Sequence, residues 1–245
     1  MKKNNKIDLV ILAGGKGSRV RNFLHGKPKP LLKINNLSFL QILLNEYAKY
    51  PFSNIYILAG YKGNIIYKRF NDKYINFIKI KCFVEKKLLG TAGALRNLKK
   101  KINNDFLLVN GDSFFDIKLN DIFLKSKYYH EMFLTNNNTY KSNKKLSNLV
   151  LNKNKKIEFK KKGSLMNAGI YYFKKNIFSN LKKNSFSLED EILPKLIEQK
   201  KIKGTYINNY FIDIGTKSSL NYARRTLAKY LNRPAAFLDR DGVIN

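Results

Sequence analysis

The stretch that decides the fold is residues 8–32, DLVILAGGKGSRVRNFLHGKPKPLL. It opens with a nearly continuous apolar run, Asp8–Ala13, which ends at Gly14 and Gly15. A short apolar run without polar alternation, stopped by glycine, is typical of a strand buried on both faces of a parallel sheet. The stretch therefore predicts a first strand followed by a tight, glycine-rich turn.

The same succession of strand, glycine turn and helix recurs through the first half of the chain, and this is the signal for β-α-β units. The expected strands are Asn54–Leu58, Ile78–Val84 and Asp105–Asn110, and the expected helices are Leu37–Tyr50 and Ala92–Ile102. The fold class that follows is α/β, with a Rossmann-like mixed, mainly parallel sheet flanked by helices.

The second half of the chain is less regular. Its expected strands are Glu131–Thr135, Leu146–Leu151, Gly169–Phe173 and Tyr210–Ile214, and its expected helices are Leu188–Gln199, capped by Ser187, and Ser218–Leu231. The polar residues Asn136–Lys145 predict a surface loop. Pro234 marks a break, after which Ala235–Leu238 is typical of a new apolar strand.

The charge of the chain is strongly unbalanced, with 48 Lys and Arg against 17 Asp and Glu and a formal charge of +31. Such a field attracts nucleic acid, anionic lipid or phosphorylated substrates. The lysines are scattered over every segment, and their short runs form no basic tail. This distribution favours compositional drift together with small anionic substrates over a nucleic-acid surface.

The cysteine count and the hydropathy of the chain indicate the cellular compartment in which the protein works. No apolar run approaches the roughly 18 residues of a membrane helix, and the apolar stretch after MKKNNK is too short for a signal peptide. The single Cys82 excludes an internal disulfide and suits a reducing compartment. We therefore expect a cytoplasmic protein without a membrane partner, with Cys82 as a core thiol and with His25 and His130 in loops.

Three groups of residues lie at the carboxyl ends of predicted strands: Gly14–Arg19, Gly111–Asp112 and Asp213. Ligands of open parallel sheets bind outside the carboxyl ends of the strands, so we expect these groups to share one cleft. The glycines expose backbone N–H groups to a phosphate. The loop matches neither the Walker motif nor the dinucleotide fingerprint. The loop is distinguished by the residues that follow it, which are Arg19 and the segment Lys27–Pro30. The prolines of this segment fix the backbone so that one lysine points into the cleft.

With this sequel, the string Leu12–Leu32 resembles the signature of the sugar-phosphate nucleotidyltransferase family. Four later segments resemble further motifs of that family in the same order. Glu85–Ala94 (EKKLLGTAGA) resembles its nucleoside-packing segment, and Val109–Asp112 (VNGD) resembles its glycine-aspartate metal site. Asn167–Tyr171 (NAGIY) resembles its sugar-binding strand, and Phe211–Thr216 (FIDIGT) resembles its closing metal-binding element. The resemblance implies the nucleotide-diphospho-sugar transferase fold.

The resemblance also implies a reaction, in which a sugar 1-phosphate attacks a nucleoside triphosphate and pyrophosphate leaves. Arg19, Lys29 and Asp112 would be catalytic, and Asp112 and Asp213 would hold Mg²⁺. The implied nucleotide-binding residues are Leu12, Ala13, Gly14, Gly15, Gly17, Ser18, Arg19, Glu85, Gly90, Thr91 and Gly111. The implied sugar-phosphate-binding residues are Lys29, Lys162, Asn167 and Gly169.

Purely structural roles stay open for some of these residues: an Asx turn for Asp112, a helix cap for Asp213, a chain turn for Asn167 and a surface charge for Arg19 and Glu85.

The chain departs from the family motif at the sugar site. Before its sugar-binding strand the family usually has phenylalanine-x-glutamate-lysine, whereas Phe159–Lys162 of this chain reads FKKK, with lysine at position 161 in place of the acid. The expected contact to sugar hydroxyls is therefore open.

The last eleven residues, Ala235–Asn245 (AAFLDRDGVIN), resemble the opening motif of the haloacid-dehalogenase phosphatases, with Asp239 as nucleophile and Asp241 as general acid/base. The sequence of this segment is most similar to that of the heptose bisphosphate phosphatases. We therefore expect a nucleotidyltransferase domain at 1–232 and a linker with the truncated first strand of a phosphatase domain at 233–245. Such a fusion implies GTP and D-glycero-D-manno-heptose 1-phosphate as substrates, for surface polysaccharide synthesis.

Three other functions compete with this one. The chain could use glucose, mannose or N-acetylated sugar 1-phosphates with UTP, dTTP, CTP or GTP. The charge of +31 also permits a nucleic-acid-binding protein, and the departure at Lys161 permits a sugar-nucleotide sensor without turnover. The sequence leaves the base, the sugar and its anomer, and the oligomeric state undetermined.

Overall fold

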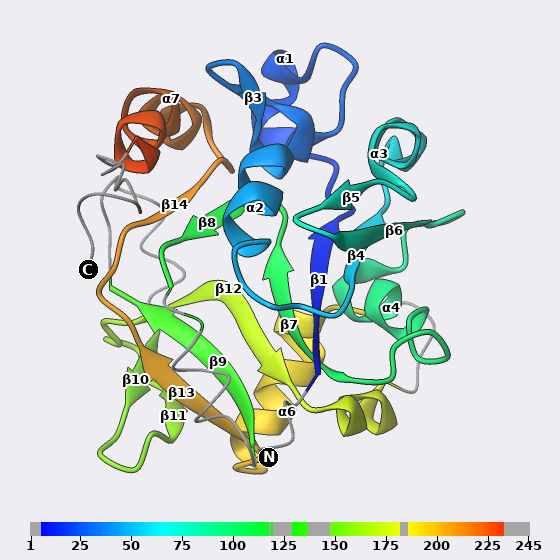
Figure 1. The fold of residues 1–245 in the computed structure, drawn as a ribbon. Coiled ribbons are helices and arrows are strands. Elements are labelled where there is room, and N and C mark those ends of the chain that lie inside the picture. The colour runs from blue at the N-terminus through cyan, green and yellow to red at the C-terminus, as the bar shows by residue number, and fades with distance from the viewer. Residues whose placement is uncertain (1–5, 118, 120–128, 137–147, 182–185, 233–245) are drawn as a thin grey trace, which may run out of the picture.

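The computed structural model describes residues 6–117, 119, 129–136, 148–181 and 186–232. Within these residues, an eight-stranded sheet forms the centre of the molecule (Figure 1). In spatial order its strands are β13 (Ile202–Tyr206), β9 (His130–Thr135), β12 (Met166–Phe173), β7 (Asp105–Asn110), β1 (Ile7–Ala13), β4 (Ile55–Ala59), β6 (Ile78–Val84) and β5 (Tyr74–Ile75).

Strand direction places a crevice at the end of β1. β1 pairs in parallel with β4 on one side and with β7 on the other. The chain first moves outward from β1 to β4 and β6, and then returns to β7 beyond β1. A reversal of this kind opens a crevice outside the carboxyl ends of the strands. β12 runs antiparallel to both β7 and β9, so the sheet is mixed but mainly parallel, as predicted.

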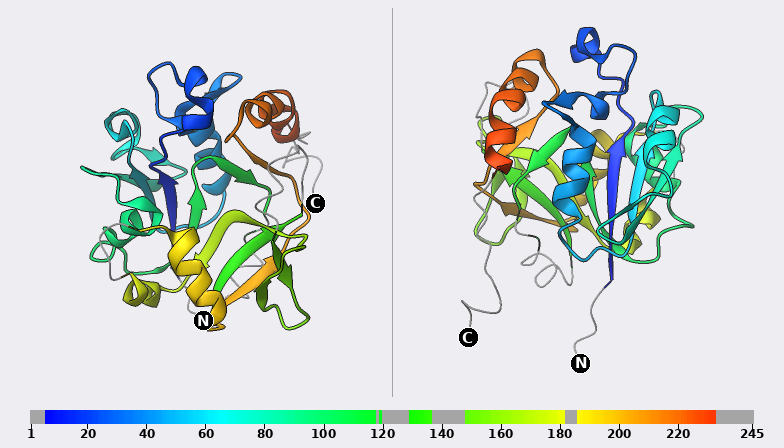
Figure 2. Two further views of the ribbon diagram at one scale, coloured as in Figure 1. Left: turned by 180° about the vertical axis from the view of Figure 1, so that it is seen from behind. Right: turned by 45° about the horizontal axis from the view of Figure 1, so that its top comes forward.

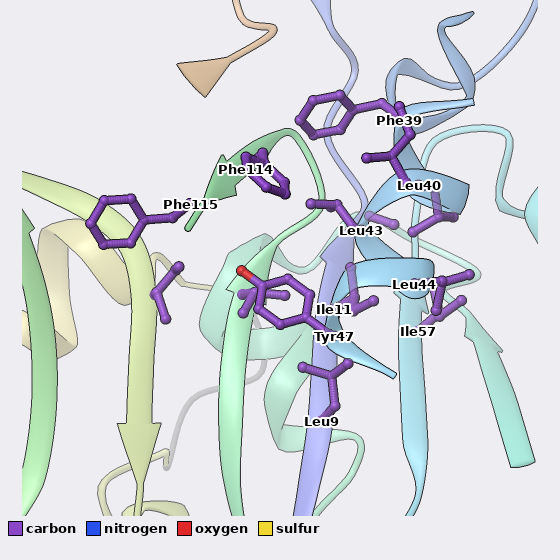
Figure 3. Close-up of a cluster of buried hydrophobic side chains, with 14 of the residues drawn as sticks. Leu9, Ile11, Phe39, Leu40, Leu43, Leu44, Tyr47, Ile57, Phe114 and Phe115 are labelled. Atoms are coloured by element: carbon purple, nitrogen blue, oxygen red, sulfur yellow. The ribbon is translucent and has the colours of Figure 1, made fainter. Parts of the chain in front are cut away.

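Alternate residues of β1 point into two hydrophobic cores, one on each face of the sheet. Leu9 and Ile11 pack with α2 (Phe39–Tyr47), whereas Val10 packs with Leu95 of α4 (Gly90–Arg96). Figure 3 shows α2 laying Leu43 and its neighbours over β1 and β4. In the view from behind, α6 (Leu193–Glu198) covers the opposite face (Figure 2). This two-sided burial explains why β1 is apolar without alternation.

Three smaller sheets complete the described structure. They pair β8 (Ser113–Phe115) with β14 (Phe211–Asp213), β2 (Lys33–Ile34) with β3 (Leu37–Ser38), and β10 (Leu149–Leu151) with β11 (Ile157–Phe159). The remaining α-helices are α1 (Arg21–Leu24), α3 (Gly63–Phe70) and α7 (Lys217–Leu231). α7 begins in a capping box, in which Thr216 and Ser219 exchange side-chain and backbone hydrogen bonds.

Several predicted elements have different bounds in the structure. The helix expected from Leu37 begins at Phe39, because Leu37 and Ser38 form the edge pair β2–β3 before Ser38 caps α2. The helix expected at Ala92–Ile102 is α4, which starts and ends earlier. Ser187 caps its helix as predicted, but the helix opens with a π-helical turn at Leu188–Ile192 before α6 begins.

The two histidines and the cysteine lie in different surroundings. His25 is exposed, just after α1. The loop prediction for His130 is wrong: it opens β9 and is buried, its Nδ1 accepts from the Lys174 N–H at 3.2 Å, and burial lowers its pKa to about 4. Cys82 is buried in β6 as predicted, and burial raises its pKa to about 12.

Some predictions fall outside the described residues. These are the surface loop beyond Asn136, the start of the strand expected from Leu146, and the linker and phosphatase strand at 233–245. Within the described ranges, no helix is long and apolar enough to cross a bilayer.

The packing of α2 on β1 predicts a large loss of stability for Leu43→Ala. Leu43 is 0% exposed, so the substitution leaves a cavity under α2 and should lower the free energy of unfolding by about 2–5 kcal/mol. Chemical denaturation followed by circular dichroism measures this change. The matched control is Leu37→Ala, because Leu37 is 44% exposed and should cost less than about 1 kcal/mol. Equal losses in the two variants would contradict the packing described.

Candidate active site

A cleft of about 410 Å³ lies over the carboxyl ends of β1, β4 and β7. It is formed by the turn after β1, by the segment that leads from β6 into α4, and by the residues that end β7. Its lining residues are Leu12, Ala13, Gly14, Gly15, Lys16, Lys29, Pro30, Leu58, Glu85, Leu88, Gly90, Thr91, Ala94, Asn110, Asp112 and Glu189. This is the place where the strand ends were predicted to converge.

The glycine loop carries Arg19 toward this cleft. Gly17 has a φ of +63°, which glycine adopts without strain, and it leads into a 3₁₀ turn at Ser18–Val20. A Cβ at Gly17 would also lie 3.1 Å from the Cβ of Lys29. Arg19 itself is exposed. The loop thus brings the lysine-proline segment against the turn after β1.

Lys29 is the lysine that the prolines aim inward. Pro28 has an extended backbone and precedes a 3₁₀ turn at Lys29–Leu31 that holds Pro30. The Lys29 side chain is only 8% exposed, and its Nζ lies 2.5 Å from Asp112 Oδ2. A buried ammonium keeps its charge only beside a counter-charge. The Lys29–Asp112 ion pair therefore fixes the cation at the mouth of the cleft.

The pairing of β8 with β14 brings the two predicted metal-binding acids together. Asp213 lies opposite Ser113, the neighbour of Asp112, and the Ile214 N–H donates to the Asp112 carbonyl at 2.9 Å. Figure 1 shows β8 and β14 side by side beyond β7. The Asp213 carboxylate accepts from the Gly215 N–H at 2.6 Å. Thr216, rather than Asp213, caps α7.

Gly215 is the point where the charged groups converge. A Cβ built there would lie 2.9 Å from Asp213 Oδ1 and 3.5 Å from both Arg19 Nη2 and Lys29 Nζ. The absence of a side chain at Gly215 therefore leaves room in which two cations and a carboxylate meet, beside Asp112. Arg19, Lys29, Asp112 and Asp213 form the charged centre of the site.

The far wall of the cleft holds Glu85 on the segment that follows β6. The Glu85 Oε2 atom is 2.9 Å from the position of a Cβ on Gly60, so glycine is needed beside it. Its Oε1 atom is buried and has no hydrogen-bond partner among the described residues. Burial raises the pKa of this carboxyl, and a backbone hydrogen bond from Leu89 partly offsets the shift. A buried acceptor without a donor is costly, which points to a ligand.

Gly90 and Thr91 complete this wall. Gly90 has a φ of +77°, and a Cβ on it would lie 2.3 Å from the Phe186 carbonyl oxygen. The Phe186 N–H in turn donates to the Leu89 carbonyl at 2.9 Å. The start of α4 is thus held against the chain that leads into the π-helical turn.

Of the predicted sugar-phosphate residues, Lys29 lines the cleft, whereas Lys162, Asn167 and Gly169 do not. Asn167 accepts from the Gly169 N–H at 2.9 Å and donates to the Tyr171 hydroxyl at 2.5 Å, in the bulge where the β12–β9 register shifts. The Asn167 side chain therefore shapes the bulge. Lys161 and Lys162 are exposed in the connection from β11 to β12 and do not line the cleft.

The structure therefore brings some predicted residues together and leaves others at the margin. The lining includes seven of the eleven predicted nucleotide-binding residues together with Lys29 and Asp112. The predicted residues outside the lining are Gly17, Ser18, Arg19, Gly111, Asp213, Lys162, Asn167 and Gly169. Of these, Arg19 and Asp213 still meet Lys29 around Gly215.

Sequence reasoning missed several lining residues. Asn110 could have been found, because it precedes Gly111 in the VNGD segment and ends β7. Glu189 carried no such signal, because in the sequence it is one of three acids in the first turn of a helix. Its place in the cleft depends on a contact to Thr91, 98 residues away.

Known proteins similar to this chain are nucleotidyltransferases. The nucleotidyl transferase family profile matches residues 9–230. The D-glycero-alpha-D-manno-heptose 1-phosphate guanylyltransferase of Campylobacter jejuni is 35% identical over 210 residues, which are 84% of this chain and 93% of that protein. The enzyme of the same name from Aneurinibacillus thermoaerophilus is 29% identical, over 92% of this chain and 100% of that protein.

Solved structures agree with the fold. The crystal structure of HddC from Yersinia pseudotuberculosis superposes with a TM-score of 0.75 at 25% identity, over 90% of this chain and 99% of that chain. The five ordered sequence motifs, the charged centre beyond β1 and these similarities agree on one conclusion. The chain belongs to the nucleotidyl transferase family.

Proposed function

We propose that the chain transfers the guanylyl group of GTP to D-glycero-D-manno-heptose 1-phosphate, releases pyrophosphate and supplies the nucleotide sugar for surface polysaccharide synthesis in the cytoplasm. Two similar curated proteins carry the name of this activity. The observation that carries the choice of base is the half-buried Glu85 side chain, whose buried Oε1 atom has no partner among the described residues.

Glu85 selects guanine by hydrogen-bond chemistry. An ionised carboxylate has two acceptor oxygens and no donor. Guanine offers two adjacent donors, N1–H and N2–H, on one edge, whereas the corresponding edges of adenine, cytosine, uracil and thymine place an acceptor beside each donor. Two N–H donors would also stabilise the charged form of a carboxyl whose pKa burial raises. A base with an acceptor facing Glu85 would leave buried polar groups unpaired.

The transfer itself needs positioning and charge neutralisation. An oxygen of the sugar 1-phosphate attacks the α-phosphorus of GTP, a new P–O bond forms, and the bond to the β-phosphate oxygen breaks as pyrophosphate leaves. The attacking phosphate is already ionised, so no protein base has to remove a proton. The protein must hold two anions together against their repulsion. Lys29 and Arg19, which converge near Gly215, are placed for this task.

The donor set at the charged centre fits a Mg²⁺ ion. Asp112 and Asp213 offer hard carboxylate oxygens on two paired strands, and Mg²⁺ in nucleotide enzymes is held by one or two carboxylates together with substrate phosphates. Among the described residues no third acid or histidine joins them, which leaves the other positions for phosphate oxygens and water. When bound, the ion would polarise the phosphates and screen their charge.

Lys29 has a second task in this arrangement. In this structure its Nζ forms an ion pair with Asp112 Oδ2 at 2.5 Å. Asp112 and Asp213 would hold the metal ion, and the Lys29 ammonium beside Asp112 would offer its charge to the phosphates. In this structure the same ammonium neutralises the Asp112 carboxylate.

The reaction is tested by measuring pyrophosphate release for each nucleoside triphosphate combined with heptose, mannose, glucose and N-acetylglucosamine 1-phosphates. We expect Mg²⁺-dependent turnover with the largest kcat/KM for GTP and the heptose, because Glu85 accepts from guanine. Turnover with glucose 1-phosphate and dTTP alone would reject the substrates and keep the reaction class. Binding to nucleic acid without any turnover would reject the class as well.

The role of Glu85 predicts a change of base preference in Glu85→Gln. The glutamine amide presents a donor where guanine N2–H needs an acceptor, so kcat/KM for GTP should fall by about 10²-fold. Uracil and thymine place an acceptor beside N3–H, so the ratio of UTP or dTTP to GTP activity should rise. The matched control is Glu198→Gln on the exposed face of α6. An unchanged base ratio would remove Glu85 from base recognition.

The metal site predicts that Asp112→Asn and Asp213→Asn each lower kcat by roughly 10³-fold without unfolding the protein. An amide oxygen is a weaker ligand than a carboxylate, so higher Mg²⁺ should recover part of the rate. The control is Asp72→Asn, because that exposed acid pairs with Lys79 away from the cleft. Near-normal turnover in either cleft variant, with an unchanged Mg²⁺ dependence, would exclude that residue from the metal site.

A further inference from the structure

Glu189 is a cleft carboxylate that neither the base nor the metal uses. It lies in the π-helical turn Leu188–Ile192, and π-helical turns are frequent at functional sites. Its Oε2 atom accepts from the Thr91 hydroxyl at 2.6 Å and from the Ser187 hydroxyl at 3.4 Å. The Leu188 N–H donates to Thr91 Oγ1 at 2.8 Å. The carboxylate is thereby fixed in position on the cleft wall.

The surroundings of Glu189 connect it to β12. Burial raises the pKa of Tyr171, and the negative charge of Glu189 raises it further. The Tyr171 hydroxyl accepts from Asn167 Nδ2 at 2.5 Å. Glu189 thus contacts Thr91 of α4 directly and acts on Tyr171 of β12 through its charge.

The other acids of the cleft have different surroundings. Among the described residues, three carboxylates line it: Glu85, Asp112 and Glu189. Glu85 is half-buried beside Gly60, and Asp112 pairs with Lys29. Glu189 is partly exposed, and the hydroxyl donors found for it in the described part of the chain both bind Oε2, so Oε1 is the oxygen that faces a further donor.

We propose that Glu189 accepts hydrogen bonds from hydroxyl groups of the sugar 1-phosphate and so positions that substrate for transfer. The proposal rests on the proposed function, because it assigns the sugar end of the same cleft. A fixed carboxylate repels phosphate but binds neutral hydroxyl donors through charge-assisted hydrogen bonds. It therefore favours the polyhydroxyl end of the sugar over its phosphate and turns the phosphate toward Lys29 and Arg19.

This assignment also accounts for the departure in the sequence before β12. Lys161 is exposed and does not line the cleft, and Glu158 is exposed on β11, where Asn152 Nδ2 donates to it at 3.2 Å. Neither residue can supply a carboxylate to the sugar from these positions. Glu189 lines the cleft and would supply one from the π-helical turn that contacts α4.

The test is Glu189→Gln, which keeps an oxygen acceptor for Thr91 and removes the charge. With the nucleoside triphosphate and sugar 1-phosphate that the wild-type enzyme turns over fastest, KM for the sugar should rise by about 10–100-fold, because hydrogen bonds to charged groups are the stronger ones. KM for the nucleotide should stay within about two-fold, since Glu189 is assigned no nucleotide contact. The matched control is Asp190→Asn, one residue on and exposed, which should match wild type.

Deoxy analogues separate a sugar contact from a merely structural role. The analogues are sugar 1-phosphates that each lack one hydroxyl group. With one of them, kcat/KM of the wild-type enzyme should fall by about ten-fold, whereas kcat/KM of Glu189→Gln should be the same as with the complete sugar. If every analogue loses equally in both proteins, or if KM rises for the nucleotide instead, Glu189 does not bind the sugar. Preference of wild type for a sugar other than the heptose would reject the proposed substrate without touching this inference. Absence of turnover with every sugar would overturn both.

Discussion

The charged centre depends on the pairing of β8 with β14. β8 is the short continuation of the chain beyond β7, and β14 comes from a segment about one hundred residues later. The three residue pairs of this ladder set Asp213 opposite Ser113 and so beside Asp112. Gly215 then turns the chain away and leaves open the space shared by Arg19 and Lys29. Without this pairing, the acids would belong to two unconnected strand ends.

The long-range field and the local charges have opposite tasks. In the proposed reaction, the net charge of +31 would draw two anionic substrates toward the molecule. Inside the cleft, two of the acids meet a donor from the protein: Asp112 meets Lys29, and Glu189 meets Thr91. The scattered lysines would thus favour the encounter with substrate, whereas the cleft carboxylates would decide which part of a substrate lies where.

The parts of the fold that could be predicted are those set by local patterns. β6 and β7 have the bounds that the sequence indicated: β7 is an apolar run buried on both faces, whereas β6 alternates buried residues with more exposed ones. The direction of Lys29 was also foreseeable, since flanking prolines restrict its backbone. The π-helical turn at Leu188–Ile192 was not, because Thr91 holds it from a distant helix. The sequence does not predict the burial of His130, because nothing in it shows that β13 and β12 enclose the start of β9.

The cleft presents carboxylates and cations at different places, and this separation matches the substrates of the proposed reaction. Glu85 and Glu189 are acids of the cleft wall, whereas Lys29 and Arg19 meet near Gly215. The two substrates together present N–H donors, then several phosphates, then hydroxyl donors. A carboxylate attracts donors and repels phosphates, so each acid both binds its own end and keeps the phosphates away from it. The phosphates are left with the space near Gly215, where Lys29 and Arg19 meet, and there the sugar phosphate and the α-phosphate would come together.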